Sequence, residues 1–138
     1  MNEQEYNQIK FFLYNYKNIE KLIEERKSEL ISRINVSNVN YLKGLKEDTN
    51  TLENTIWKID EDVYIRNLKR WRVCLKNVLA FLVQKNPRCY KYYDLKFNKK
   101  KTKEEITEAL KIDFNEQKLL KDKLIAIVYK SAKIRNLF

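Results

Sequence analysis

The chain has 138 residues, of which 43% are hydrophobic and 35% are charged. This balance favours a helix-rich soluble protein over a disordered one, and the length suits one modest domain or two small ones. A single glycine and a single proline argue against a sandwich or barrel, because tight turns with positive φ usually need glycine. We therefore expect an all-α protein built from a few long helices.

The residue types that are missing argue against catalysis and against bound cofactors. The chain has no histidine, and Cys74 and Cys89 do not form a CxxC pair, so we expect no metal site and no cofactor. No glycine-rich phosphate loop is present. The consecutive acids Asp60, Glu61 and Asp62 fan around a helix, which favours an exposed acidic patch over a catalytic cluster.

The sequence shows no sign of export or of membrane insertion. The first residues, MNEQEYNQ, lack the basic and apolar pattern of a secretory signal, and no apolar run is long enough to cross a bilayer. We therefore expect a cytoplasmic protein with reduced thiols and no membrane association.

Positive charge is concentrated near the C-terminus. Residues 1–86 carry 15 basic and 12 acidic side chains, whereas residues 87–138 carry 14 and 7, so the net charges are +3 and +7. Such asymmetry indicates a polyanionic partner, because neutralised phosphates release counterions. Lysine-rich helices that are simply solvated explain the charge equally well.

Two long helices are expected within residues 1–86. The first, over residues 3–34, has its apolar side chains at three- and four-residue steps: Tyr6, Ile9, Leu13, Tyr16, Ile19, Ile23, Leu30 and Ile34. Its charged side chains balance at six basic and six acidic, which is typical of a solvated outer face. The second helix begins near Asn50 and ends at Pro87, because the residue before a proline is disfavoured in a helix.

The stretch Asn35–Thr51 holds the only glycine and is expected to connect these helices. We expect residues 1–86 to form an antiparallel hairpin with Trp57 and Trp71 in its core. This hairpin would oligomerise or bind a partner, and a homodimer through the N-terminal helices is one candidate. Six basic residues and no acid lie between Arg66 and Lys85, and they favour DNA-backbone contact and a solvated face equally.

Residues 87–138 predict three shorter helices. Arg88–Phe97 is the first, and the capping box Thr102–Glu105 opens a second that continues to Leu110. A second cap, Asp113–Glu116, opens the third helix. The inner face of this third helix is expected to hold Leu119, Leu120, Leu124, Ile127 and Val128. Two capped helices about four residues apart match a helix-turn-helix, so we expect residues 87–138 to form a DNA-binding domain.

The helix that opens at Asp113 would enter the major groove of double-stranded DNA. Its outward candidates for base and phosphate contact are Asn115, Lys118, Lys121 and Lys123, with Glu116 and Asp122 among them. Phosphate contacts are expected from the segment that precedes the second helix, namely Lys99, Lys100, Lys101, Thr102 and Lys103. The chance spacing of three ordinary helices is the competing explanation.

The C-terminal pattern resembles a known family. The stretch YYDLKFNKK at 92–100, followed by apolar positions from Ile106 to Ile125, looks like the promoter-reading domain of sigma factors. It is more similar to the RinA/ArpU-type late transcription regulators of Gram-positive phages, as is the stretch 14–30. The resemblance implies a sequence-specific regulator, encoded by a phage or prophage, that activates a late promoter by recruiting RNA polymerase.

The chain departs from the family pattern at three points. The cap of the recognition helix is Asp113 where the family has Ser or Thr. Gln117 stands where a small apolar residue is usual, so its polar side chain would press on the scaffold helix. The recognition helix also carries two acids, Glu116 and Asp122. These departures favour backbone contact through Lys99–Lys103 over base reading.

Two alternatives from other classes stay open. The first is a helical interaction or assembly protein, in which the N-terminal apolar stripe pairs with a partner helix and no promoter is bound. The second is a small phage packaging subunit, which would also bind DNA through a helix-turn-helix.

Overall fold

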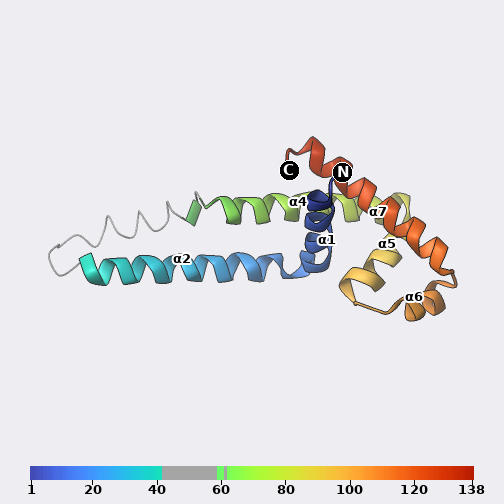
Figure 1. Ribbon diagram of the computed structural model, residues 1–138, viewed down its shortest axis with the longest axis horizontal. Helices are drawn as coiled ribbons and strands as arrows, with labels where there is room; N and C mark the ends of the chain where they lie inside the picture. The colour runs from blue at the N-terminus through green and yellow to red at the C-terminus, as the bar shows by residue number, and fades with distance from the viewer. Residues whose placement is uncertain (42–58, 61) are drawn as a thin grey trace. The chain divides into compact units, whose positions relative to one another are not determined.

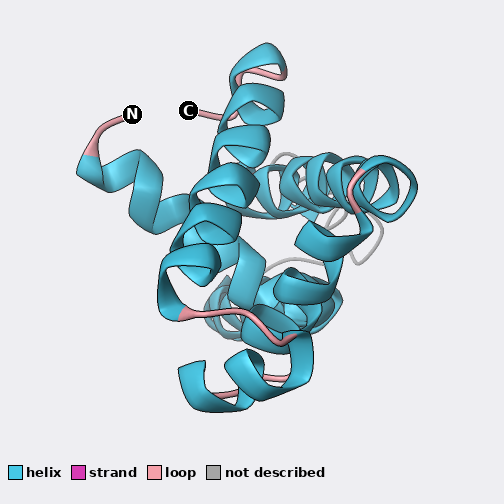
Figure 2. Cartoon of the chain, turned by 90° about the vertical axis from the view of Figure 1, so that its right-hand side faces the viewer, coloured by secondary structure: helices cyan, strands magenta, loops and turns pink. Residues whose placement is uncertain are grey.

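The computed structural model describes residues 1–41, 59–60 and 62–138. All regular secondary structure in these ranges is helical, which confirms the all-α prediction (Figure 2). The predicted start of the second helix near Asn50, as well as Trp57 and Glu61, lies outside the described residues.

The helices follow one another without strands between them in the described ranges (Figure 1). They are α1 (Glu3–Asn15), a 3-10 turn η1 (Tyr16–Asn18), α2 (Ile19–Tyr41), α4 (Val63–Lys85), α5 (Pro87–Tyr93), a π-helical turn η2 (Asp94–Asn98), α6 (Lys103–Leu110) and α7 (Phe114–Ile134). The chain divides into two compact units. The first unit contains Met1–Lys17 together with Arg70–Phe138, and the second contains Asn18–Lys69. The boundary expected between residues 86 and 87 falls inside the first unit.

The prediction of one uninterrupted helix over residues 3–34 is wrong. The helix changes to a 3-10 turn at Tyr16–Asn18, and α2 then continues to Tyr41. Asn15 supplies the physical reason, because its side-chain amide donates to the carbonyl of Phe11 at 2.8 Å and competes for an acceptor of the helical ladder. The backbone at 35–41 is helical rather than part of the connection, since Asn and Ser cost a helix only about 0.5 kcal/mol per residue.

The end of α4 and the start of α5 lie close to the positions that the sequence predicts. Helix α4 ends at Lys85, and Pro87 occupies the first turn of α5, where its missing N–H is no loss. The Asn86 side chain caps α5 by accepting from the backbone N–H of Cys89 at 3.2 Å. The predicted helix over Arg88–Phe97 is therefore present as α5 with η2.

Aromatic side chains hold the first unit together. Phe12 of α1 stacks on Trp71 of α4 with ring centroids 4.6 Å apart, and Trp71 is fully buried, as expected. Phe97 of η2 contacts Tyr14 of α1 with centroids 4.7 Å apart. Burial raises the pKa of Tyr92 to about 12, so this core hydroxyl stays protonated at neutral pH. The remaining interior includes Ile9, Leu13, Leu75, Leu82, Ile106, Leu124 and Val128.

In the second unit, Arg26 of α2 binds the carboxylate of Asp62 through two hydrogen bonds, at 3.0 and 3.2 Å. Asp62 also accepts from the backbone N–H of Ile65, so it caps the start of α4. These hydrogen bonds hold the pKa of the Asp62 carboxyl below its ordinary value. Asp62 is therefore a half-buried cap and ion-pair partner, and its expected place in an exposed acidic patch is wrong; Asp60 is exposed.

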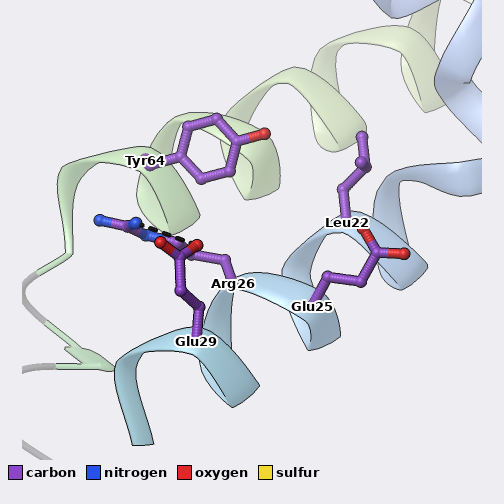
Figure 3. Close-up of a pocket in the computed structure, with 5 residues that line it drawn as sticks. All are labelled: Leu22, Glu25, Arg26, Glu29 and Tyr64. Atoms are coloured by element: carbon purple, nitrogen blue, oxygen red, sulfur yellow. Dashed lines mark ion pairs between the residues drawn. The ribbon is translucent and has the colours of Figure 1, made fainter. Parts of the chain in front are cut away.

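A surface hollow of about 330 Å³ lies in the second unit (Figure 3). It is lined by Leu22, Glu25, Arg26 and Glu29 of α2 and by Tyr64 of α4. Arg26 already pairs with Glu29 and Asp62, and its guanidinium lies 5.8 Å from the Tyr64 ring centroid. The hollow is thus lined by side chains that already pair with one another.

Within the described ranges, no helix is both long and apolar enough to traverse a bilayer.

The Phe12–Trp71 stack generates a stability prediction with a neighbouring control. Phe12→Ala should lower the free energy of unfolding by about 3–5 kcal/mol, because it removes a buried ring and leaves a cavity. Phe11→Ala should cost less than about 1 kcal/mol, because the Phe11 side chain is 44% exposed. Urea unfolding followed by circular dichroism measures both, and equal losses would contradict the packing.

Candidate nucleic-acid interface

Both predicted helix caps in the C-terminal segment are present. The backbone N–H of Glu105 donates to Thr102 Oγ1 at 3.2 Å, and the N–H of Thr102 donates to the Glu105 carboxylate at 3.4 Å. At the next helix, the N–H of Glu116 donates to Asp113 Oδ1 at 2.8 Å. Helices α6 and α7 therefore begin where the sequence predicts.

The connection between α6 and α7 is three residues long, one fewer than expected. Lys111 takes a left-handed conformation with φ of 55°, which costs a non-glycine residue about 1 kcal/mol. Ile112 is buried, and its N–H donates to the carbonyl of Thr107 at 3.3 Å. The apolar anchor and this hydrogen bond fix the turn despite the strain at Lys111.

Gln117 connects the two helices through hydrogen bonds. Its side chain is only 5% exposed, and Nε2 donates to the carbonyl of Lys103 at 2.8 Å and to Thr107 Oγ1 at 2.7 Å. The Thr107 hydroxyl in turn donates to the Lys103 carbonyl at 2.9 Å. The polar side chain does press on α6, as expected, and both of its contacts are hydrogen bonds that satisfy the buried amide nitrogen.

The inner face of α7 differs from the prediction at one residue. Leu124 and Val128 are buried and Leu120 and Ile127 are half-buried, but Leu119 is 69% exposed. Leu119 follows the buried Gln117 by two residues, which turns it about 200° around the helix. The prediction that Leu119 lies on the inner face of α7 is therefore wrong. The inner face includes the polar Gln117, which the spacing of apolar residues alone does not reveal.

The outer face of α7 brings together three of the four contact residues predicted on this helix. Asn115, Lys118 and Lys123 are exposed, together with Glu116 and Asp122. Phe114 and Leu119 are exposed beside them, and neither is predicted by the sequence pattern because apolar residues in a helix are usually assigned to its core. Lys121 is separate from this group, because it is half-buried with its ammonium 5.8 Å from the Tyr6 ring centroid of α1.

The basic segment Lys99–Lys103, which leads into the first residue of α6, is exposed, but part of its charge is paired. Lys99 forms an ion pair with Asp94 at 3.3 Å, and Lys101 forms one with Glu105 at 3.6 Å. Within the described residues, Lys100 and Lys103 have no acidic partner within ion-pair distance. These two lysines are therefore the most available for an external phosphate, and Thr102 already caps α6.

Glu116 is less of an obstacle to an anion than its position suggests. Arg88 of α5 forms an ion pair with this carboxylate at 3.1 Å, so an acid in the first turn of α7 is partly neutralised. Both side chains are about half exposed, and solvent therefore keeps the energy of the pair small. Asp113 and Asp122 remain exposed acids on the same helix.

Comparison with known proteins adds no family to this description: no family model, curated protein or solved structure matches the chain.

The Gln117 contact can be tested by an apolar replacement of similar length. Gln117→Met should lower the free energy of unfolding by about 1–2 kcal/mol, because two buried hydrogen bonds to α6 are lost while most of the volume is kept. Lys118→Met is the matched control, and its effect should stay within about 0.5 kcal/mol because Lys118 is exposed. Thermal unfolding compares the two variants. A Gln117→Met variant with the same free energy of unfolding as the unchanged protein would show that the amide does not stabilise the α6–α7 contact.

Proposed function

We propose that the chain binds double-stranded DNA through α6 and α7, which act as a helix-turn-helix. The observation that carries the proposal is the Gln117 contact across a three-residue turn. This contact turns one face of α7 onto α6 and leaves the opposite face, with Asn115 and Lys118, exposed. A helix held in this way can enter a major groove with its N-terminal residues nearest the bases.

The chemistry of the exposed groups fits a duplex. The side-chain amide of Asn115 can pair with the N6 and N7 atoms of adenine, and Lys118 and Lys123 can reach guanine or phosphate. Lys100, which precedes α6, and Lys103, its first residue, supply phosphate contacts that set the register without reading sequence. Phe114 and Leu119 add apolar surface that suits thymine methyl groups.

The biological role proposed for this site is transcriptional regulation. The resemblance to RinA/ArpU-type regulators supports a phage or prophage protein that activates a late promoter by recruiting RNA polymerase. Dimerisation would have to use a surface other than the apolar face of α1, because Ile9, Phe12 and Leu13 are buried within the first unit. Cytoplasmic localisation belongs to the same proposal.

A helical interaction or assembly protein is the second candidate, and a specific observation favours it. Large apolar side chains are exposed on α7 as well as on α4, where Phe81 is one of several. Exposed apolar surface of this kind is typical of protein-binding faces. Duplex binding separates the two candidates, because an assembly protein of this type would not need it.

Duplex affinity should depend steeply on salt, and the dependence should map to the lysines before α6. Lys100→Ala/Lys103→Ala should reduce the slope of log Kd against log salt by about 2, because each phosphate contact releases about one counterion. Lys21→Ala/Lys27→Ala removes the same charge from α2 and should leave the slope nearly unchanged. Fluorescence anisotropy with a labelled duplex measures both, and no duplex binding at low salt would refute the proposed function.

Base reading is tested at Asn115. Selection from a random duplex pool should enrich a motif with an adenine that the Asn115→Ala protein no longer requires, with a loss of about 1–3 kcal/mol on the selected site. Lys118→Ala should instead weaken selected and unselected duplexes together if it contacts phosphate alone. An Asn115→Ala protein that enriches the same motif with the same affinity would exclude Asn115 as a base-reading residue.

A further inference from the structure

The exposed side of α4 carries a stripe without an assigned role, in which three residues are apolar and two are polar amides. Val73, Asn77, Ala80, Phe81 and Gln84 recur at helical spacing on one side of the helix, and all five are exposed. Phe81 is 50% exposed, and Val83 beside the stripe is 51% exposed. The opposite side of α4 holds the buried Leu75, Val78 and Leu82. We call the five exposed residues the α4 outer face.

The stretch of sequence that contains the α4 outer face is basic, and part of its charge is already paired, since Arg88 forms an ion pair with Glu116 of α7. From Val63 to Tyr93 the chain has no acidic residue, and it has eight basic ones: Arg66, Lys69, Arg70, Arg72, Lys76, Lys85, Arg88 and Lys91. Lys76 and Lys85 are exposed along the edges of the stripe, and neither forms an ion pair with another residue in the described ranges. The stripe therefore combines Val73, Ala80 and Phe81 with two uncharged amides, and it has a lysine along each edge.

This combination narrows the class of partner. A second copy of the same face would bring the two sets of lysines together without an acid to separate them, which disfavours self-association. A duplex backbone would gain from the lysines but not from contact with Val73, Ala80 and Phe81, since its phosphates are charged. A helix with acidic residues beside an apolar stripe matches both features, and helices commonly recognise one another through such anchors.

We propose that the α4 outer face docks an acidic amphipathic helix of a partner protein. The stripe from Val73 to Gln84 extends about 16 Å at 1.5 Å per residue, which fits about three turns of a partner helix. Phe81 and Val73 provide the apolar anchors, and Lys76 and Lys85 pair with carboxylates on either side. This proposal uses no residue of the α7 outer face, so it does not depend on DNA binding.

The test uses the full chain and two labelled synthetic peptides of identical composition. One places leucines at helical spacing with glutamates beside them, and the other scrambles that order. Fluorescence anisotropy should show that the amphipathic peptide binds and that the scrambled peptide binds at least about tenfold more weakly. Phe81→Ser should weaken amphipathic-peptide binding by about tenfold or more. Ile134→Ser, at a residue that is 79% exposed at the end of α7, should leave it unchanged.

A charge-reversal pair provides a second, independent variant. Lys76→Glu/Lys85→Glu should weaken the amphipathic peptide by at least about tenfold. Lys21→Glu/Lys27→Glu changes the net charge equally and should have a much smaller effect. All four changed lysines and Phe81 lie at or near the surface. Circular dichroism of each variant checks that the helices are retained.

Several results would overturn the proposal. They are equal binding of the two peptides, failure of the amphipathic peptide to bind, and equal effects of Phe81→Ser and Ile134→Ser. Phe81-dependent binding to phosphatidylserine vesicles without peptide binding would assign the face to a membrane surface. Phe81-dependent self-association in sedimentation would assign it to a second copy. If the full chain binds the amphipathic peptide but no DNA duplex, the proposed DNA-binding function is refuted and the docking proposal is not.

Discussion

The buried indole of Trp71 is the contact through which distant parts of the sequence are joined in the first unit. Phe12 from α1 stacks on it, and Phe138 at the end of the chain meets it edge-on with centroids 5.7 Å apart. The indole N–H finds no hydrogen-bond partner in the described part of the chain, which costs about 1–3 kcal/mol. Burying about 200 Å² of aromatic surface contributes about 5 kcal/mol, so the packing outweighs the missing hydrogen bond.

This packing determines what α7 can present to a partner. Cys74 and Ser131 are in hydrogen-bond contact between α4 and α7, and Arg70 donates to the carbonyl of Arg135 at the end of α7. At its other end α7 is held by Gln117 against α6. Contacts at both ends fix the rotation of α7 about its own axis, so Asn115 and Leu119 are on the exposed side as a consequence of the core.

The local features of the fold could be predicted because their causes are local. Thr102 and Asp113 cap helices through residues three positions away, and Pro87 interrupts a helix through its own ring. The break at Tyr16–Asn18 depends on a side-chain bond from Asn15, which the apolar spacing does not reveal. The exposure of Leu119 and the pairing of Glu116 with Arg88 depend on how distant helices pack, and the sequence pattern carries no signal for either.

The two exposed helix faces differ in a way that argues for different partners. The α7 outer face mixes Asn115, lysines and acids, which suits selective hydrogen bonding. The α4 outer face combines Val73, Ala80 and Phe81 with lysines at its edges and has no acid on its own helix, which suits burial against an oppositely charged helix. Each face is the exposed side of a helix whose other side is in the core, so occupying one does not require unpacking the other. A chain that held a duplex on α7 and an acidic helix on α4 would join the two molecules.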